Sequence, residues 1–129
     1  MRRVVVTGLG LLTPIGYGVD VAWGRLIEGQ SGIGAVQSFD VADLPCRVAG
    51  EIPIGDGSDG SFNVDDCIVP KEQRKMDRFI IYAMAAAIQA VEASGWKPED
   101  EEDQNRTGVM IGSGIGGLPA IAEAAICLQ

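Results

Sequence analysis

The segment that most restricts the fold of this chain is Phe79–Ser94, which is apolar on nearly every helical face. Large apolar side chains recur along it among many alanines, at Ile80, Met84, Ile88 and Val91. A helix without a polar face has to be covered all round, and alanine permits close packing against neighbouring backbones. Gly95 is the expected helix end, and Pro98 keeps the helix from resuming. We therefore expect a buried helix between layers of other structure.

Two further stretches predict strands of a layered α/β fold. Arg3 to Leu12 begins with three consecutive valines, and Arg106 to Ile111 is a second apolar stretch that runs into glycines. A continuous apolar run bounded by glycines is typical of a strand buried on both faces. Helices are expected beside them. Asp20 would cap one that ends at Gly29, and another would start near Leu118 or Pro119.

Two segments are predicted to be solvent-exposed. Gly55–Ser61 consists of glycine, aspartate and serine, which is the composition of an exposed loop. Residues 99–103 are five consecutive acids, and we expect a solvated loop between a helix and a strand. After the last predicted helix the sequence stops at Gln129 with no capping residue and no returning strand, which predicts that the chain is a fragment.

Charge and composition exclude several function classes. The chain has 129 residues and a net charge of −8, so neither nucleic acid nor an anionic membrane is an expected partner. It has no histidine and no close cysteine pair, which argues against a metal site and rules out Ser-His-Asp or Cys-His catalysis within these residues. The unpaired cysteines are typical of a reducing, cytoplasmic compartment and are interpreted as structural or incidental: Cys46, Cys67 and Cys127.

The glycine loop 112–117 is the first candidate site. It fits G-x-G-x-x-G through Gly112, Gly114 and Gly117, between a predicted strand and a predicted helix. That setting can hold a dinucleotide, with its pyrophosphate on the helix N-terminus. The acidic residue that this pattern requires about 20 residues downstream would lie past Gln129. The other interpretation is that the glycines let the backbone turn sharply beside something bulky.

The second candidate is a cluster of four basic residues in an otherwise acidic chain. Lys71, Arg74, Lys75 and Arg78 have the spacing i, i+3, i+4, i+7, which would place them on one helical face following Pro70. Glu72 and Asp77 are expected to project elsewhere. The cluster is either a solvated helical face or a docking site for an acidic protein.

Three segments, in order and in register, resemble the elongating β-ketoacyl-acyl carrier protein synthases, closest to the synthase II type. They are Arg2–Gly10 with the following Thr13–Gly16, then Lys71–Asp77, then Ile111–Gly117. Gly29–Ile33 and the pair Phe39-Asp40 also match. The resemblance implies the thiolase fold, an α/β fold of stacked layers in the order α-β-α-β-α. Residues 1–129 would form a partial amino-terminal domain, only part of its first half.

The resemblance also implies an activity. Such synthases are homodimers that condense an acyl group, held on a cysteine, with malonyl-acyl carrier protein by a decarboxylative Claisen condensation in fatty acid elongation, without a cofactor. Two histidines assist the decarboxylation. The nucleophilic cysteine and both histidines would lie beyond Gln129, so no catalytic residue is expected here and the chain alone is expected to be inactive.

Two roles transfer to residues of this chain through the resemblance. Gly114 and Ile115 correspond to the floor of the acyl-chain pocket, and Lys71, Arg74 and Lys75 correspond to the patch that meets acyl carrier protein. Two alternatives stay open: a small nucleotide-binding domain that uses the 112–117 turn, and a non-catalytic module that docks acyl carrier protein.

Overall fold

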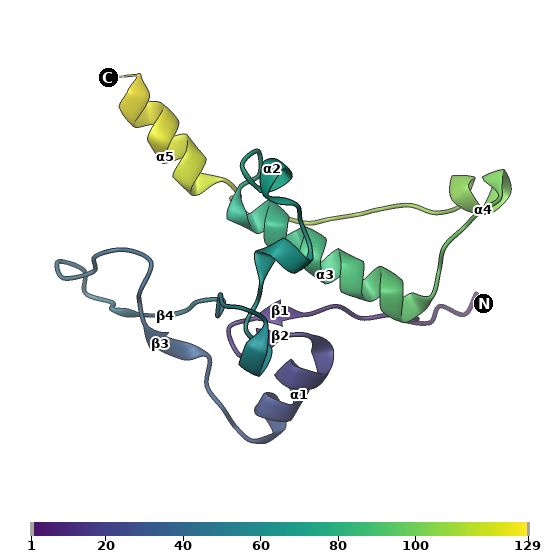
Figure 1. Cartoon of the computed structure of the whole chain (residues 1–129), viewed down its shortest axis with the longest axis horizontal. Coiled ribbons are helices and arrows are strands. Elements are labelled where there is room, and N and C mark those ends of the chain that lie inside the picture. Colours follow the sequence, from purple (N-terminus) through teal and green to yellow (C-terminus); the bar gives the residue numbers. More distant parts are fainter. Residues whose placement is uncertain (1, 129) are drawn as a thin grey trace.

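The computed structural model of the protein describes residues 2–128, which are arranged around one long helix, α3 (Arg78–Ser94) (Figure 1). The elements before it are β1 (Leu12–Thr13), β2 (Gly16–Tyr17), α1 (Val19–Ile27), β3 (Ile33–Ala35), β4 (Val48–Gly50), the 3-10 turns η1 (Ser58–Gly60) and η2 (Val64–Asp66), and α2 (Pro70–Gln73). After it come α4 (Glu101–Asn105) and α5 (Leu118–Cys127). Figure 1 shows α4 and α5 lying beyond opposite ends of α3.

The predicted helices are confirmed, with one correction to a cap. α3 starts one residue before the predicted Phe79 and ends at Ser94, where Gly95 adopts a left-handed φ of 65°. α5 begins at the predicted Leu118. α1 is capped by Gly18 rather than by Asp20, which instead lies in the first turn. There its carboxylate still favours the helix, because the amino-terminal end carries a partial positive charge.

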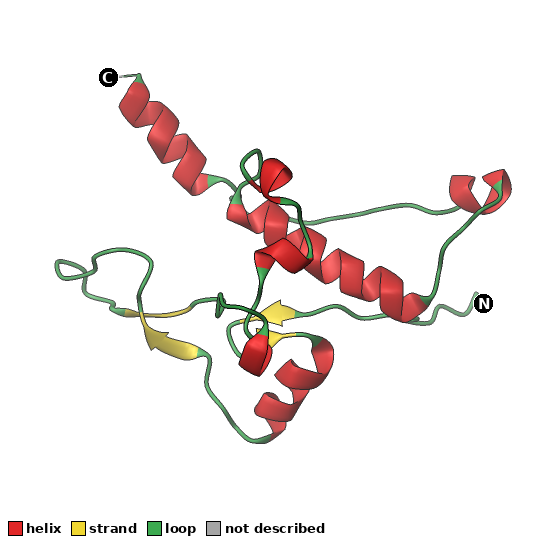
Figure 2. Cartoon of the chain, viewed as in Figure 1, coloured by secondary structure: helices red, strands yellow, loops and turns green. Residues whose placement is uncertain are grey.

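The two predicted buried strands are wrong for the residues that the structure describes. Residues 3–10 and 106–111 are drawn as irregular chain (Figure 2), and their apolar side chains are exposed, with Val4 at 92% and Val109 at 87%. A strand requires backbone hydrogen bonds to a neighbouring strand. Between residues 2 and 128 no other segment supplies those bonds to 3–10 or to 108–111.

The observed strands form two small antiparallel pairs. β1 pairs with β2 through Leu12↔Tyr17 and Thr13↔Gly16. β3 pairs with β4, with Ala35 opposite Val48. The chain after β3 therefore lies beside the chain before β4, and the N–H of Val36 donates to the carbonyl of Arg47. Glu51, which follows β4, accepts hydrogen bonds from the backbone N–H groups of Gln37 and Ser38.

The acidic segment is a short helix rather than the predicted loop. Asp100 accepts a hydrogen bond of 2.9 Å from the backbone N–H of Asp103 and so caps α4. The residues of α4 remain largely exposed, as expected for a solvated segment. The other predicted loop, Gly55–Ser61, is confirmed in part: residues 55–59 are exposed, whereas Gly60 and Ser61 are half-buried and residues 58–60 form η1.

The core lies on one side of α3. It consists of Phe62, Ile68, Ile81 and Ala85. Of the α3 side chains only Ile81 and Ala85 are buried, and Val91 on another face is 50% exposed. Within residues 2–128 the described segments thus pack mainly against one side of this apolar helix, and its other faces are not covered by the chain's own residues, as expected for a partial domain.

The amino-terminal segment runs along α3 at very short range (Figure 1). A Cβ atom added to Gly8 would overlap the carbonyl oxygen of Ala90, and one added to Gly10 would overlap that of Ala86. Leu11, the next residue, is held by the Gln89 side-chain amide. The backbone N–H of Leu11 donates to Gln89 Oε1 at 3.3 Å, and the backbone carbonyl of Leu11 accepts from Gln89 Nε2 at 3.3 Å. Only glycine permits the backbone to approach a helix this closely.

Tyr17 connects the first hairpin to this core. Its ring lies 5.0 Å from that of Phe62, which in turn makes an edge contact with Tyr82 at 6.2 Å. The Tyr17 hydroxyl lies 3.1 Å from Cys67 Sγ. Burial, reinforced by the hydrogen bond with Cys67, raises the pKa of Tyr17 from its ordinary value of 10.0 to about 12.

This shift predicts a loss of stability in alkali. Below pH 10 the tyrosine is protonated in both the folded and the unfolded chain, so its contribution to the free energy of unfolding is fully present and does not vary with pH. Between pH 10 and about 12 only the unfolded chain releases the proton, so the free energy of unfolding should fall as the pH rises. Urea unfolding measured across this range should show a shallower decline for Tyr17→Phe. An equal decline in both proteins would contradict the shift.

Candidate functional site

The two sequence-predicted sites lie near the amino-terminal end of α3. The chain reaches that end through α2 and a turn at residues 74–77, and the 112–117 loop returns to it before α5 begins (Figure 1). Pro70 is the first residue of α2. Proline is tolerated there because the backbone N–H that it lacks would have no partner within the helix at this position. Asp77 is extended and precedes α3, so the direction of the chain changes between the two helices.

The basic cluster does not form the predicted single helical face. α2 ends at Gln73, so Lys71 lies on α2, Arg74 and Lys75 lie in the turn, and Arg78 opens α3. The 3.6-residue period that would align all four is broken by the extended Asp77. All four side chains are nevertheless exposed within a short stretch of surface-lying chain.

The acidic neighbours of this cluster also differ from the prediction. Glu72 does not project elsewhere but forms an ion pair of 2.8 Å with Lys75. Both side chains are well exposed, so this pair contributes little stability. Gln73 anchors α2 from the other side, donating to Asp65 Oδ1 at 2.8 Å and to the carbonyl of Ile68 at 2.6 Å.

The end of the glycine loop packs against the start of α3. A Cβ atom on Gly116 would lie 2.6 Å from the Phe79 ring, and one on Gly117 would lie 2.7 Å from Asp77 Oδ2. Gly117 also has a left-handed φ of 73° and precedes α5. At these two positions the interpretation of a turn beside something bulky is confirmed. Gly112 and Gly114 have nothing within 4 Å of an added Cβ.

Ile115 and Arg78 meet at one cavity. Its volume is about 250 Å³, and its lining includes Ile115, Phe79, Tyr82 and Arg78. Ile115 itself is 79% exposed, and Gly114 is not part of this lining. The structure thus brings one of the two predicted pocket residues to the same corner of the molecule as the basic cluster.

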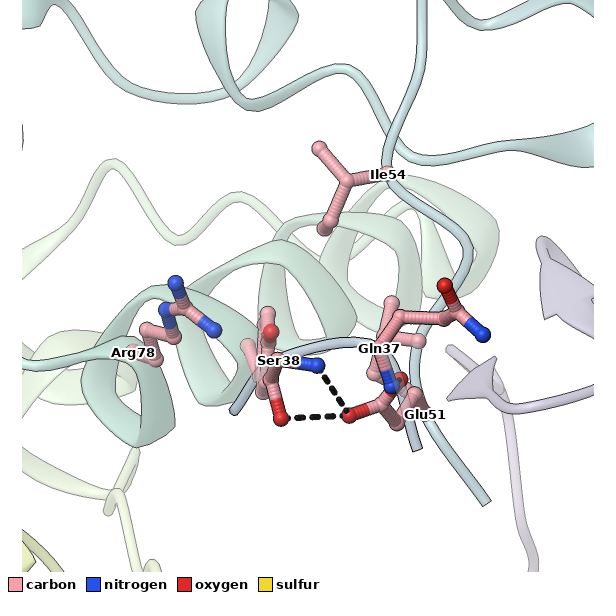
Figure 3. A pocket seen from close by; sticks show the side chains of 7 residues that line it. Gln37, Ser38, Glu51, Ile54 and Arg78 are labelled. Carbon is pink, nitrogen blue, oxygen red and sulfur yellow. Dashed lines mark hydrogen bonds between the residues drawn. The ribbon is translucent and has the colours of Figure 1, made fainter. Parts of the chain in front are cut away.

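A neighbouring hollow contains residues that sequence reasoning missed (Figure 3). It measures about 420 Å³, and Glu51 and Arg78 lie on its wall. Hydrogen bonds from the Ser38 hydroxyl and from the backbone N–H groups of Gln37 and Ser38 lower the pKa of Glu51, with a smaller contribution from Arg78. No local pattern marks Glu51 in the sequence, because Ser38 and Glu51 are 13 residues apart and meet only in the folded chain.

The cysteines form no recognisable centre among the described residues. Cys46 is exposed in a loop, Cys67 is half-buried beside Tyr17, and Cys127 is exposed at the last residue of α5. Within residues 2–128 no group of three potential metal ligands comes together, and no helix is long and apolar enough to cross a membrane.

Comparison with known proteins identifies the family. Residues 1–126 match the family described as Beta-ketoacyl synthase, N-terminal domain. The chain belongs to the β-ketoacyl synthase family. All three segments on which the resemblance was based lie within the matched residues.

Relatives among the β-ketoacyl synthases are similar over almost the whole chain. A 3-oxoacyl-[acyl-carrier-protein] synthase 2 of Rhizobium meliloti is 57% identical over 129 residues, which are 100% of this chain and 31% of that protein. One of Vibrio cholerae is 46% identical over 120 residues, 93% of this chain and 27% of that protein. The chain therefore spans less than a third of the length of these relatives.

A solved structure extends the likeness to the fold. The ishigamide ketosynthase/chain length factor superposes with a TM-score of 0.61 and 35% identity, over 74% of this chain and 22% of that one. A ketosynthase fold of mixed helices and strands is thus shown. Membership of the β-ketoacyl synthase family favours the condensing-enzyme interpretation over a small nucleotide-binding domain built on the 112–117 turn.

Proposed function

We propose that this chain is the amino-terminal part of an elongating β-ketoacyl-acyl carrier protein synthase of the synthase II type. The complete protein would join an enzyme-bound acyl thioester to malonyl-acyl carrier protein with loss of carbon dioxide, in fatty acid elongation. The observation that carries this proposal is the match of residues 1–126 to the family, together with the 57% identity to a synthase 2. The complete protein would be a cytoplasmic homodimer with the layered α-β-α-β-α arrangement of the thiolase fold and no cofactor.

The chemistry of the condensation is assigned to residues beyond Gln129. A nucleophilic thiolate and two histidines are needed, and the chain has no histidine. Cys127 ends α5, exposed and away from the glycine loop and the basic cluster, so it is not a candidate nucleophile. This chain would contribute substrate recognition, and alone it would be inactive.

Recognition of the carrier protein is assigned to Lys71, Arg74 and Lys75. Their side chains are exposed on α2 and the following turn, in a chain whose net charge is otherwise strongly negative. A local positive patch of this kind draws an acidic partner to one orientation and raises its rate of association. The 2.8 Å ion pair between Lys75 and Glu72 would have to open or be shared when the partner binds.

Selection of the acyl-chain length is assigned to Ile115, together with the neighbouring Gly114. Ile115 is one of the residues that line the cavity at the start of α3, and its branched side chain would limit how far an acyl chain enters. Gly114 has free space around its Cα, so the loop can hold the isoleucine without crowding. Side-chain bulk at this position would therefore limit the depth of an acyl pocket.

The proposed function is tested on the complete synthase with acyl- and malonyl-acyl carrier protein as substrates. We expect release of carbon dioxide and formation of 3-oxoacyl-acyl carrier protein. The double reversal Arg74→Glu with Lys75→Glu should raise KM for the carrier-protein substrates about tenfold, the equivalent of ~1.4 kcal/mol, and flatten the salt dependence of KM.

The matched control is the double variant Lys97→Glu with Arg106→Glu. It makes the same change of net charge at two exposed residues near α4. It should leave KM within about twofold of the original protein, because screening weakens the effect of a remote charge. Absence of condensation would remove the proposed function. An equal rise of KM in both double variants would remove the docking assignment.

Ile115→Phe in the complete synthase tests the pocket assignment. The larger ring should slow long acyl substrates about 5- to 150-fold relative to short ones, because overfilling a pocket costs about 1–3 kcal/mol. Competing short and long acyl primers, with the products separated by mass, measure this ratio directly. Ile126→Phe on exposed α5 is the matched control and should leave the ratio unchanged. Equal slowing of long and short primers by Ile115→Phe would contradict the assignment.

A further inference from the structure

The carboxylate of Asp77 is not used by the helix that Asp77 precedes. Asp77 occupies the cap position of α3, and its backbone carbonyl accepts hydrogen bonds from the N–H groups of Ile80 and Ile81. An aspartate at this position usually also caps the helix with its side chain. Here the side chain forms no such bond with α3, all of whose residues the structure describes. The carboxylate instead lies against Gly117, where an added Cβ atom would be 2.7 Å from Asp77 Oδ2.

The helix that follows Gly117 starts without a negative group of its own. α5 has a glycine at its cap position, no acidic residue in its first turn and a proline, Pro119, as its second residue. Its first N–H groups have no partner within the helix, and together they carry a partial positive charge. Glu123 is the acidic residue of α5, but it lies beyond the first turn, where this effect fades. Asp77 thus brings to the start of α5 the carboxylate that the local sequence lacks.

The last two glycines of the 112–117 loop are held by the residues on either side of Arg78. Gly117 lies against Asp77, and Gly116 lies against the Phe79 ring, where an added Cβ atom would be 2.6 Å away. Ile115 comes directly before these two glycines and lines the 250 Å³ cavity together with Asp77 and Phe79. Earlier in the loop an added Cβ atom on Gly112 or Gly114 would meet nothing within 4 Å. The position of Ile115 therefore depends on the contacts that follow it.

We propose that Asp77 is a positioning residue for the selection of acyl-chain length. Its carboxylate holds Gly117 and the start of α5 in place, and so fixes the part of the loop that presents Ile115. This inference rests on the proposed function, in which Ile115 limits how far an acyl chain enters. It adds a residue that acts through Ile115 rather than by binding the carrier protein. Without this carboxylate the loop would be held less firmly, and a long acyl chain could displace Ile115 more easily.

A role of Asp77 in selection differs measurably from an indirect effect on carrier binding or on folding. Long and short acyl groups arrive on the same carrier protein, so a change in carrier binding alters the rates of both equally. A smaller folded fraction also lowers both rates equally. The ratio of kcat/KM for long and short acyl primers therefore changes only if the discrimination between them changes.

The test compares Asp77 variants of the complete synthase with long and short acyl primers in competition, with the products separated by mass. Asp77→Asn keeps the size of the side chain and removes its charge, so the long-to-short ratio should rise about three- to fivefold. Asp77→Ala also removes the contact with Gly117 and should raise the ratio further. Glu123→Gln is the matched control, because it removes the same charge from the wall of a cavity that Asp77 also lines. It should change the ratio by less than about 1.5-fold, since Glu123 lies beyond the first turn of α5.

A second background tests whether Asp77 acts through Ile115. In Ile115→Ala no branched side chain is left to position, so adding Asp77→Asn should leave the ratio of that variant unchanged. A shift of the same size in both backgrounds would overturn the inference.

The remaining outcomes separate this inference from the proposed function. If neither Asp77 variant shifts the ratio while Ile115→Phe still does, the inference is overturned and the pocket assignment stands. An equal shift with Glu123→Gln, or a uniform loss of activity with every primer in Asp77→Asn, also overturns it. Absence of condensation in the original protein removes the proposed function and this inference with it.

Discussion

The structure depends on the close contact between the amino-terminal segment and α3. Gly8 and Gly10 lie so near the carbonyl oxygens of Ala90 and Ala86 that no side chain fits between the two backbones. Gln89 then secures Leu11 through both its N–H and its carbonyl, as a neighbouring strand would. This contact sets where β1 and β2 lie, and through Tyr17 and Phe62 it sets how the core packs on the same helix.

The positions of the proposed docking patch and acyl pocket are set by α3. Its amino-terminal end carries Arg78, supports the glycine loop through Phe79, and follows the turn that presents Arg74. Recognition of a carrier protein and gauging of an acyl chain would therefore occur at one corner of the molecule. Because the acyl group would arrive on the carrier protein, a docking surface and a pocket at one end of one helix are consistent with the proposed function.

The longer helices of this fold were predictable from the sequence, whereas α4, the strands and part of the site were not. Phe79–Ser94 has a strong local pattern and a glycine stop, and the helix ends where that pattern predicts. The valine run at residues 4–6 has an equally strong pattern, but a strand is completed by a partner that no described residue provides. The spacing of the basic residues at 71–78 predicted one helical face. The extended Asp77 breaks that face, and the spacing alone gave no sign of the break. Glu51 carries no local signal, because its hydrogen bonds with Gln37 and Ser38 join segments that are distant in the sequence.

The close contact at α3 is tested most directly by adding one methyl group at Gly10. Gly10→Ala should lower the free energy of unfolding of the protein by about 1–3 kcal/mol and speed hydrogen exchange along α3, because the backbones must separate. Gly34→Ala provides the matched control, since an added Cβ there meets nothing within 4 Å, and it should change stability by no more than about 0.5 kcal/mol. Equal stability and equal exchange of α3 in the two variants would contradict the account.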